Sequence, residues 1–409
     1  MSTLTHGQPD TAIRTRLLTT PLAATFAAEF TSLTSFFLLL SAMPMLAAAA
    51  GAGSSGAGLI TGSLLLGTVA AEMAAAPALR RFGYRIVVAA GAVLLGAPAL
   101  AMLVREPQAV MVGVSVLRGF GFGLCGVATG ALTATLLPPD RRGEGLGLLG
   151  IVAGVPAIVA LPAGVWLAGH HLAAAAAATA AVTGLLPLVA IRWLPDERHV
   201  PRPARTERAA GAGRLAGAGR MKGAVRLAGA VRLAGTVRLP LIFAAATIAA
   251  GVVDSFLPLA KGIPSSLSSA ALLVQAIVAT ITRWQAGKLG DRHGHARLLI
   301  PALAVAAAGM VTMMLLGFPA AIFAGMVLFG AGFGVIESAT FALLIEQLPE
   351  ARASALWNLA YDAGYGAGPA MFGLICVRTG YPVAFALTGV LILVTVPAAL
   401  RERSAERLA

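Results

Sequence analysis

The sequence predicts an all-α polytopic membrane protein, with twelve transmembrane helices arranged as two pseudo-symmetric six-helix bundles. Three observations lead to this fold class. Of the 409 residues, 58% are hydrophobic and 11% are charged, whereas soluble domains contain roughly 45–50% and about 25%, respectively. Apolar runs of transmembrane length recur along the whole chain. Finally, the second half of the sequence repeats the first.

Twelve apolar runs are long enough to cross a hydrocarbon layer of ~30 Å as helices. They cover approximately residues 21–46, 57–79, 86–104, 108–137, 144–168, 172–193, 239–260, 267–287, 297–317, 319–347, 352–377 and 382–400. The first run is longer than the core of a cleaved signal peptide, so we expect it to remain as a helix. Cys125 and Cys376 fall inside runs, where we expect them to pack as small apolar side chains.

The net charge of +13 predicts membrane topology rather than nucleic-acid binding. If the N-terminus is cytoplasmic, 26 of the 30 Lys and Arg residues fall on the cytoplasmic side, and three on the outer side: Arg105, Lys261 and Arg378. The positive-inside rule produces this bias. We therefore expect a multi-pass protein of the cell membrane (the plasma or inner membrane), with both termini cytoplasmic and the lipid bilayer as its partner.

The chain contains an internal repeat with a constant offset of 211 residues. The stretch LRGFGFGLCGVATGALTATLLPPDRR begins at Leu117 and resembles LFGAGFGVIESATFALLIEQLPEAR, which begins at Leu328. The same offset relates two further pairs, Arg81 with Arg292 and Gly83 with Gly294. Because two separate regions share one offset, the repeat indicates that the chain is a tandem duplication.

The duplication divides the chain into three parts: an N-terminal six-helix half at 1–193, a basic cytoplasmic linker at 194–238 and a C-terminal six-helix half at 239–409. Five linker arginines recur every six residues: Arg214, Arg220, Arg226, Arg232 and Arg238. On a helix this spacing spreads them over three sides, so no amphipathic face forms. The pattern favours a flexible linker near anionic lipid over a binding element.

The segment GKLGDRHG, at 287–294, carries the resemblance of this chain to a known family. That family has the pattern G-x-L-x-D-R-x-G-x-R after its second and eighth helices. The chain matches it at Gly287, Leu289, Asp291, Arg292 and Gly294, with Arg297 following. Together with the twelve runs, the duplication and the basic central loop, this motif resembles the major facilitator superfamily. Within that family, the chain looks most like the twelve-helix, drug-export-like permeases of actinobacteria.

The resemblance implies that this loop is part of an inner gate. Asp291 is then expected to lie against the start of the fifth helix, near 143–145 in the other half, where unpaired N–H groups favour an anion. Arg292 is expected to pair with Glu346 at the cytoplasmic end of the run 319–347. The alternative is that these charges only mark a cytoplasmic loop.

The first copy of the motif departs from the family pattern. Arg81 and Gly83 remain, but Arg80 replaces the aspartate, and Thr135 stands where the second half has Glu346. We therefore expect an asymmetric gate, closed mainly through the C-terminal half. Glu72, deeper in its helix, is a candidate partner for Arg80 or Arg81.

Ionisable residues inside membrane spans are costly and usually face the protein interior or a water-filled cavity. Arg118, in RGFGFG, resembles an arginine motif of the fourth helix of the family that is implicated in proton coupling. Glu29 is its first candidate partner. This pair would be either a proton carrier with its arginine or a static ion pair that joins two helices.

Three further acidic residues fall inside spans: Asp254, Glu337 and Asp362. They are candidates for a substrate or proton pathway, although membrane helices also use such groups to hydrogen-bond their neighbours. The other residues of the spans are mainly Ala, Gly, Leu and Phe, which favours loosely selective binding of apolar compounds.

The resemblance implies a secondary active transporter that works by alternating access. We expect proton-coupled export of a small apolar or amphiphilic compound by a monomer, without cofactor, metal or nucleic acid. The alternative within transport is a proton symporter for metabolite uptake. A receptor lacks support because there is no sizeable soluble domain. An enzyme lacks support because the sequence has no metal-ligand cluster, no paired nucleophile and base, and no phosphate-binding glycine loop.

Overall fold

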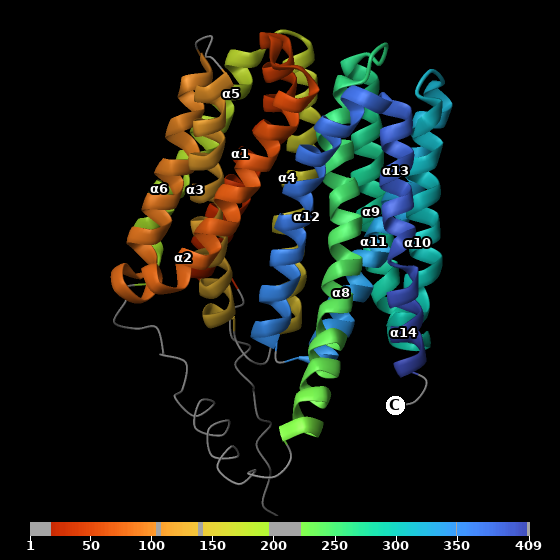
Figure 1. Ribbon diagram of the computed structural model, residues 1–409. Coiled ribbons are helices and arrows are strands. Elements are labelled where there is room, and N and C mark those ends of the chain that lie inside the picture. Colours follow the sequence, from red (N-terminus) through yellow and green to blue (C-terminus); the bar gives the residue numbers. More distant parts are fainter. Residues whose placement is uncertain (1–17, 104–107, 138–141, 196–221, 349, 407–409) are drawn as a thin grey trace, which may run out of the picture.

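The computed structural model describes residues 18–103, 108–137, 142–195, 222–348 and 350–406. Every regular element in these ranges is a helix. Figure 1 shows long helices side by side, the first half of the chain on one side and the second half on the other. Apolar side chains all around such helices are expected where the surroundings are lipid and neighbouring helices.

The first half begins with α1 (Thr20–Ala47) and a π-helical stretch (Ala48–Ala52). It continues with α2 (Gly53–Gly96), a 3-10 stretch (Ala97–Leu103), α3 (Gln108–Leu136), α4 (Arg142–Gly169), α5 (Ala173–Leu185), α6 (Pro187–Ala190) and a 3-10 turn (Ile191–Trp193). The break between α5 and α6 lies where Pro187 starts a new first turn.

The second half consists of α8 (Lys222–Phe256), α9 (Ser265–His293), α10 (His295–Thr312), α11 (Pro319–Gln347), α12 (Glu350–Thr379), α13 (Tyr381–Val394) and α14 (Val396–Glu406). Short 3-10 turns follow α8 and α10. The chain reverses between α9 and α10 at Gly294, whose φ of 90° is accessible mainly to glycine.

The same reversal occurs inside α2, where Gly83 has a φ of 76°. This reversal divides α2 into two segments, each of which crosses the membrane. Gly83 and Gly294 are related by the 211-residue offset. Among the described residues, nine stretches are long and apolar enough to cross a membrane, and the first of them, Thr20–Leu103, contains α1 and both parts of α2. With these three segments and with α12, the described residues account for twelve crossings, which confirms the predicted fold class.

Close packing of glycines repeats in the two halves. A Cβ on any of three α3 glycines would overlap the backbone of a neighbouring helix: Gly119 at Leu64, Gly121 at Gly91 and Gly123 at Thr68. Three α11 glycines are equally close to their neighbours: Gly330 at Gln275, Gly332 at Ala302 and Gly334 at Ala279. Every residue of the second set is 211 positions after its counterpart. The duplication therefore has a structural basis, because small residues let membrane helices approach closely.

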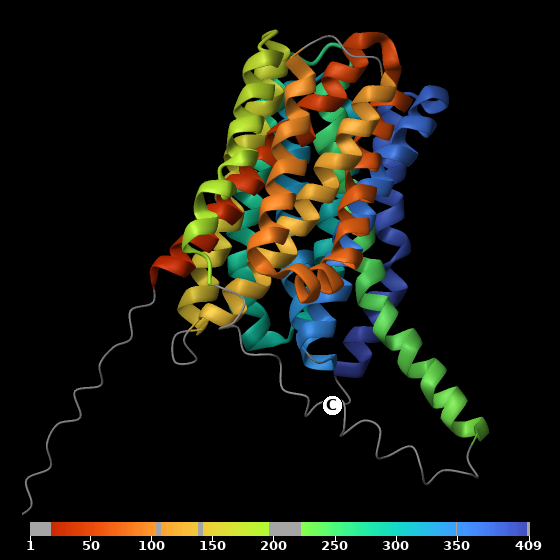
Figure 2. The same ribbon diagram turned by 90° about the vertical axis from the view of Figure 1, so that its left-hand side faces the viewer.

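The predicted linker, 194–238, is partly helical, because α8 already begins at Lys222. Figure 2 shows this first part of α8 extending beyond the ends of the neighbouring helices. Its residues are mainly Ala, Leu, Val and Arg, most of which are good helix formers. A flexible linker is therefore not observed for 222–238, while residues 196–221 lie outside the described part of the chain. The boundaries at 193 and 239 stay predictions.

The two halves touch through α2 with α12 and through α4 with α9. Ser54 and Ser55 donate hydrogen bonds to the carbonyl of Gly373 at 3.4 and 3.3 Å, and Gly169 lies against Ser265. These residues are at the end of the bundle opposite the C-terminus (Figure 1). The described contacts therefore close that end of the molecule.

Candidate functional site

Polar side chains of α1 and α3 contact each other at two levels. At one level, Thr129 donates a hydrogen bond to the carboxylate of Glu29. At the other, the guanidinium of Arg118 donates hydrogen bonds to the carbonyl and hydroxyl oxygens of Ser35, at 2.9 and 3.4 Å. The two helices run antiparallel, so residues that follow one another on α1 meet residues in reverse order on α3.

Arg118 is completely buried. Besides Ser35, it donates a hydrogen bond of 2.5 Å to the carbonyl of Leu95 near the end of α2, while its Nε has no described partner. Among the described residues, no carboxylate forms an ion pair with it. Arg118 therefore joins α3 to α1 and α2 through backbone carbonyls.

The expected pair between Glu29 and Arg118 is wrong in this structure. Glu29 is partly buried and lies at the level of Thr129, which is eleven residues from Arg118 and therefore about 16 Å away along α3. Thr129 was visible in the sequence only as a repeat position, paired with Thr340. Its hydroxyl is the group that positions Glu29.

Asp254 is held in the second half between α8 and α12. Its carboxylate accepts a hydrogen bond from the hydroxyl of Tyr365, and its residue surface is 7% exposed. Tyr365 ends a column of aromatic rings on α12, in which Trp357, Tyr361 and Tyr365 are four residues apart, with ring centroids 5.9 and 5.5 Å apart. Rings at this spacing lie on one helix face, so the column fixes the donor that orients Asp254.

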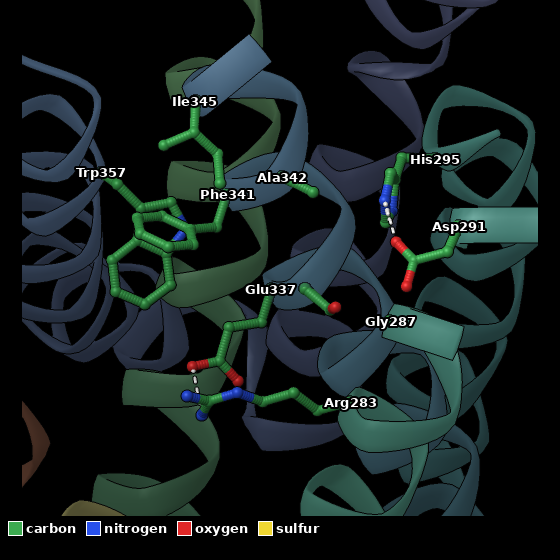
Figure 3. Close-up of a pocket in the computed structure, with 10 residues that line it drawn as sticks. Arg283, Gly287, Asp291, His295, Glu337, Phe341, Ala342, Ile345 and Trp357 are labelled. Atoms are coloured by element: carbon green, nitrogen blue, oxygen red, sulfur yellow. Dashed lines mark hydrogen bonds and ion pairs between the residues drawn. The ribbon is translucent and has the colours of Figure 1, made fainter. Parts of the chain in front are cut away.

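Glu337 on α11 forms an ion pair with Arg283 on α9. Arg283 Nη1 and Glu337 Oε1 are 2.9 Å apart, and the two side chains are 51% and 11% exposed, respectively. Figure 3 shows both pointing toward each other at one end of a cavity. In the sequence, this pair is visible only as two opposite charges in the separate spans 267–287 and 319–347.

The cavity beside this pair has a volume of about 400 Å³. It is lined by Arg283, Gly287, Asp291, His295, Glu337, Ser338, Phe341, Ala342, Ile345 and Trp357. Figure 3 shows the aromatic rings of Phe341 and Trp357 on one side and the Asp291–His295 pair on the other. The lining is therefore more polar than the composition of the spans predicted.

The Arg283–Glu337 pair is expected to contribute modestly to stability, because Arg283 is half exposed. Arg283→Gln and Glu337→Gln should each lower the free energy of unfolding by about 1 kcal/mol. The double variant should lose little more than either single variant, because both remove the same interaction. Urea unfolding of the four proteins in detergent measures this, and strictly additive losses would contradict a direct pair.

The gate motif adopts a different set of contacts from the expected one. Asp291 pairs with His295, at 3.4 Å, and its side chain is 78% exposed rather than held against the start of α4. Arg292 and Glu346 are both exposed and form no described ion pair. Gly294 provides the turn. The expected contacts of Asp291 and Arg292 are thus absent from the described residues.

This difference has a conformational explanation. The described contacts between the halves are at the end opposite the C-terminus, and the gate motif lies at the other end, where α9 meets α10. In alternating access the two ends close in turn. The gate contacts of Asp291 and Arg292 therefore stay predictions for the other conformation.

In the first half, Glu72 does not pair with the neighbouring arginines as expected. Arg80 and Arg81 are exposed, and Arg81 lies over the ring of Phe82 at 5.2 Å. Glu72 is instead hydrogen-bonded to Asp362 of α12, in the other half. Attraction between opposite charges could not have predicted this contact between two carboxyl groups.

The described residues contain no candidate metal-binding site. In the part of the chain that the structure describes, no three His, Cys, Asp or Glu side chains gather in a way that could hold a metal ion. The residues brought together are carboxyls with hydroxyl, guanidinium or carboxyl partners. Such groups can bind protons or polar parts of a solute.

Comparison with known proteins gives the same fold throughout. The chain is similar to the crystal structure of a D-xylose-proton symporter, with 16% identity, a TM-score of 0.73, and 93% of this chain and 96% of that chain covered. It is similar to the nucleoside transporter NupG, with 12% identity, a TM-score of 0.70, and 93% and 98% coverage. It is also similar to the partially occluded inward open conformation of the xylose transporter XylE from E. coli, with 17% identity, a TM-score of 0.69, and 93% of this chain and 97% of that chain covered. No curated protein sequence matches the chain.

A family model provides the assignment that structures of such low identity do not. The model described as Major Facilitator Superfamily matches residues 25–355 and again 262–408. Its first match covers most of the chain, and the overlapping second match covers the C-terminal half. The chain therefore belongs to the Major Facilitator Superfamily of membrane transporters.

Proposed function

We propose that this protein is a proton-coupled exporter of small apolar or amphiphilic compounds, of the drug-export type. It acts as a monomer in the cell membrane, with both termini in the cytoplasm. In this orientation the closed end of the bundle faces outward, and the gate motif is at the cytoplasmic end.

One observation carries the proposal. Among the described carboxyl side chains within the membrane helices, Asp254, Glu337 and Asp362 are at most 8% exposed, and Glu29 and Glu72 are partly buried. Among the described residues, only Glu337 has a basic partner. Acidic groups at such depth are costly and mark proton or substrate pathways, so they support coupling to protons.

The experiment uses purified protein in liposomes with an imposed pH gradient and a panel of amphiphilic fluorescent compounds. The wild type is expected to move at least one compound against its gradient, in exchange for protons. Glu29→Gln keeps the hydrogen bond from Thr129 but cannot carry a proton, so gradient-driven movement should be lost. Asp254→Asn gives the same test for the second half, and Glu402→Gln, which changes a carboxyl bonded to Gln347 and Arg238, is the matched control.

Gradient-driven movement that persists in both Glu29→Gln and Asp254→Asn would contradict the role of these two carboxyls. Loss of movement in Glu402→Gln as well would show that any carboxyl replacement impairs the protein. In that case the losses would carry no information about protons.

The second candidate is a proton symporter for a polar metabolite. The polar lining of the 400 Å³ cavity, with Arg283, Glu337, Asp291 and His295, favours it. The two functions differ in the direction of proton movement. A pH-sensitive dye inside the liposomes would report protons moving with the solute in symport and against it in export.

A further inference from the structure

The α2–α12 contact extends inward from the closed end of the molecule to Glu72. Along it, residues of α2 meet residues of α12 in antiparallel order: Ser54 with Gly373, Gly58 with Pro369, and Leu65 with Gly366. Glu72 follows Leu65 by two helical turns, and Asp362 precedes Gly366 by one. The next contact that the structure describes is between these two carboxyl groups.

The Glu72–Asp362 contact joins the two halves of the transporter. Asp362 is 7% exposed and Glu72 is partly buried. A hydrogen bond between two carboxyl groups needs a proton on one of them, because a carboxylate can only accept. Two carboxylates that share one site cannot both be ionised without strong repulsion.

The repeat explains why Glu72 reaches the other half. The 211-residue offset relates Glu72 to Arg283 and Gly126 to Glu337. In the second half, Arg283 and Glu337 pair within the bundle. In the first half, Gly126 offers no side chain, and a Cβ there would meet nothing within 4 Å. Among the described residues of its own bundle, Glu72 therefore has no partner at this position.

The pseudo-symmetric interface lacks an equivalent pair. The offset relates Asp362 to Ile151 of α4, so the contact between α4 and α9 has an apolar residue opposite the position of Arg283. Among the described residues, the carboxyl pair is thus present between α2 and α12 and has no counterpart between α4 and α9. Because of this asymmetry, a proton can stabilise or weaken the α2–α12 contact without changing the α4–α9 contact.

Buried and partly buried charged groups on the helices that pack against α2 and α12 already have partners. Asp254 of α8 is bonded to Tyr365, and Glu337 of α11 is paired with Arg283 of α9. Arg118 of α3 is bonded to backbone carbonyls, and Glu29 of α1 is bonded to Thr129. Tyr361, beside Asp362 on α12, is neutral at physiological pH. No described Lys, Arg or His forms an ion pair with Glu72 or Asp362.

We propose that Glu72 and Asp362 together bind one proton, and that this shared proton holds the two halves in the conformation that is closed at the outer end. Loss of the proton places two negative charges side by side and drives α2 away from α12. The inference rests on the proposed alternating access, for which it supplies a proton site between the halves. Protonation then favours outer closure, and deprotonation favours outer opening.

The test measures how often the outer end is closed. Cysteines replace Thr61 of α2 and Ser255 of α8, whose hydroxyl oxygens are 3.0 Å apart across the contact between the halves, in a background in which the two buried native cysteines are replaced (Cys125→Ala and Cys376→Ala). The rate of disulfide formation is measured across a pH series, with and without Glu72→Gln. Because thiols themselves react faster as pH rises, each rate is compared with that of Glu72→Gln at the same pH.

The amide of Glu72→Gln donates to Asp362 at every pH and so imitates the protonated pair. The wild-type rate, relative to Glu72→Gln, is expected to fall about tenfold or more from acidic to alkaline pH. Asp362→Asn should behave as Glu72→Gln does, and Glu402→Gln should keep the wild-type pH dependence. A constant ratio across the series would overturn the proposal.

A second measurement needs neither cysteines nor a substrate. Infrared difference spectra at neutral pH should contain the C=O band of a protonated carboxylic acid that disappears in both Glu72→Gln and Asp362→Asn. If the band persists in both variants, the shared proton is wrong. If the band and the disulfide result hold but no compound moves in liposomes, the proton site stands and the proposed export function fails.

Discussion

Arg118→Leu is expected to destabilise the protein more than any other single replacement of a charged residue. The change leaves the carbonyls of Leu95 and Ser35 without donors inside the membrane, and each buried unsatisfied group costs about 1–3 kcal/mol. Arg118→Lys should be only slightly better, because an ammonium group lacks the planar fork that reaches two helices. Thermal unfolding of the purified protein in detergent measures the loss.

The matched control is Arg378→Leu, which removes an exposed arginine at the end of α12 and should change the unfolding midpoint little. Glu29→Gln adds a second comparison. If Glu29 were the partner of Arg118, it would destabilise the protein as strongly as Arg118→Leu does. An unchanged midpoint for Arg118→Leu would contradict the bonding described here.

Gly58→Leu is expected to prevent closure of the outer end. A Cβ at Gly58 would overlap the carbonyl oxygen of Pro369 across the α2–α12 contact. Overpacking of this kind costs about 1–3 kcal/mol, which is enough to reduce the population of the closed conformation about 5- to 150-fold. The change acts only on the conformation in which α2 and α12 touch.

Accessibility to a thiol reagent that cannot cross membranes measures this effect. Ser255 is buried at the contact with Thr61, where the two hydroxyl oxygens are 3.0 Å apart. A cysteine at this position (Ser255→Cys) should react from outside in Gly58→Leu but react slowly otherwise. Gly113→Leu, where a Cβ would meet nothing within 4 Å, is the control. Equal labelling in all three proteins would contradict outer closure through α2 and α12.

The fold could be predicted because its signals are local. The apolar runs, the 211-residue repeat and the glycines that reverse the chain, Gly83 and Gly294, are all properties of short segments. Membrane spans must satisfy their own backbone hydrogen bonds, so a long apolar run has few alternatives to a helix. The linker was less predictable, because the good helix formers after Lys222 outweigh the absence of an amphipathic face.

The partners of the charged residues could not be predicted in the same way. Arg118 and Glu29 have opposite charges on neighbouring helices, but they lie at different depths, and depth depends on how helices are shifted along each other. The partners of Asp291 and Arg292 are expected to change with the end of the molecule that is closed. A single structure describes one of the two conformations. Glu72 and Asp362 were each recognised as unusual, yet their contact lies between groups of like charge.

In alternating access the two halves rock about the membrane centre, so the outer end must open in every transport cycle. A disulfide between cysteines at two positions of the contact between the halves (Thr61→Cys and Ser255→Cys) would lock that end, because the two native hydroxyl oxygens are 3.0 Å apart in the closed conformation. With a compound that the protein moves in liposomes, the oxidised protein is expected to stop transport, and reduction should restore it. Transport that continues at the full rate with the disulfide formed would contradict alternating access in this protein.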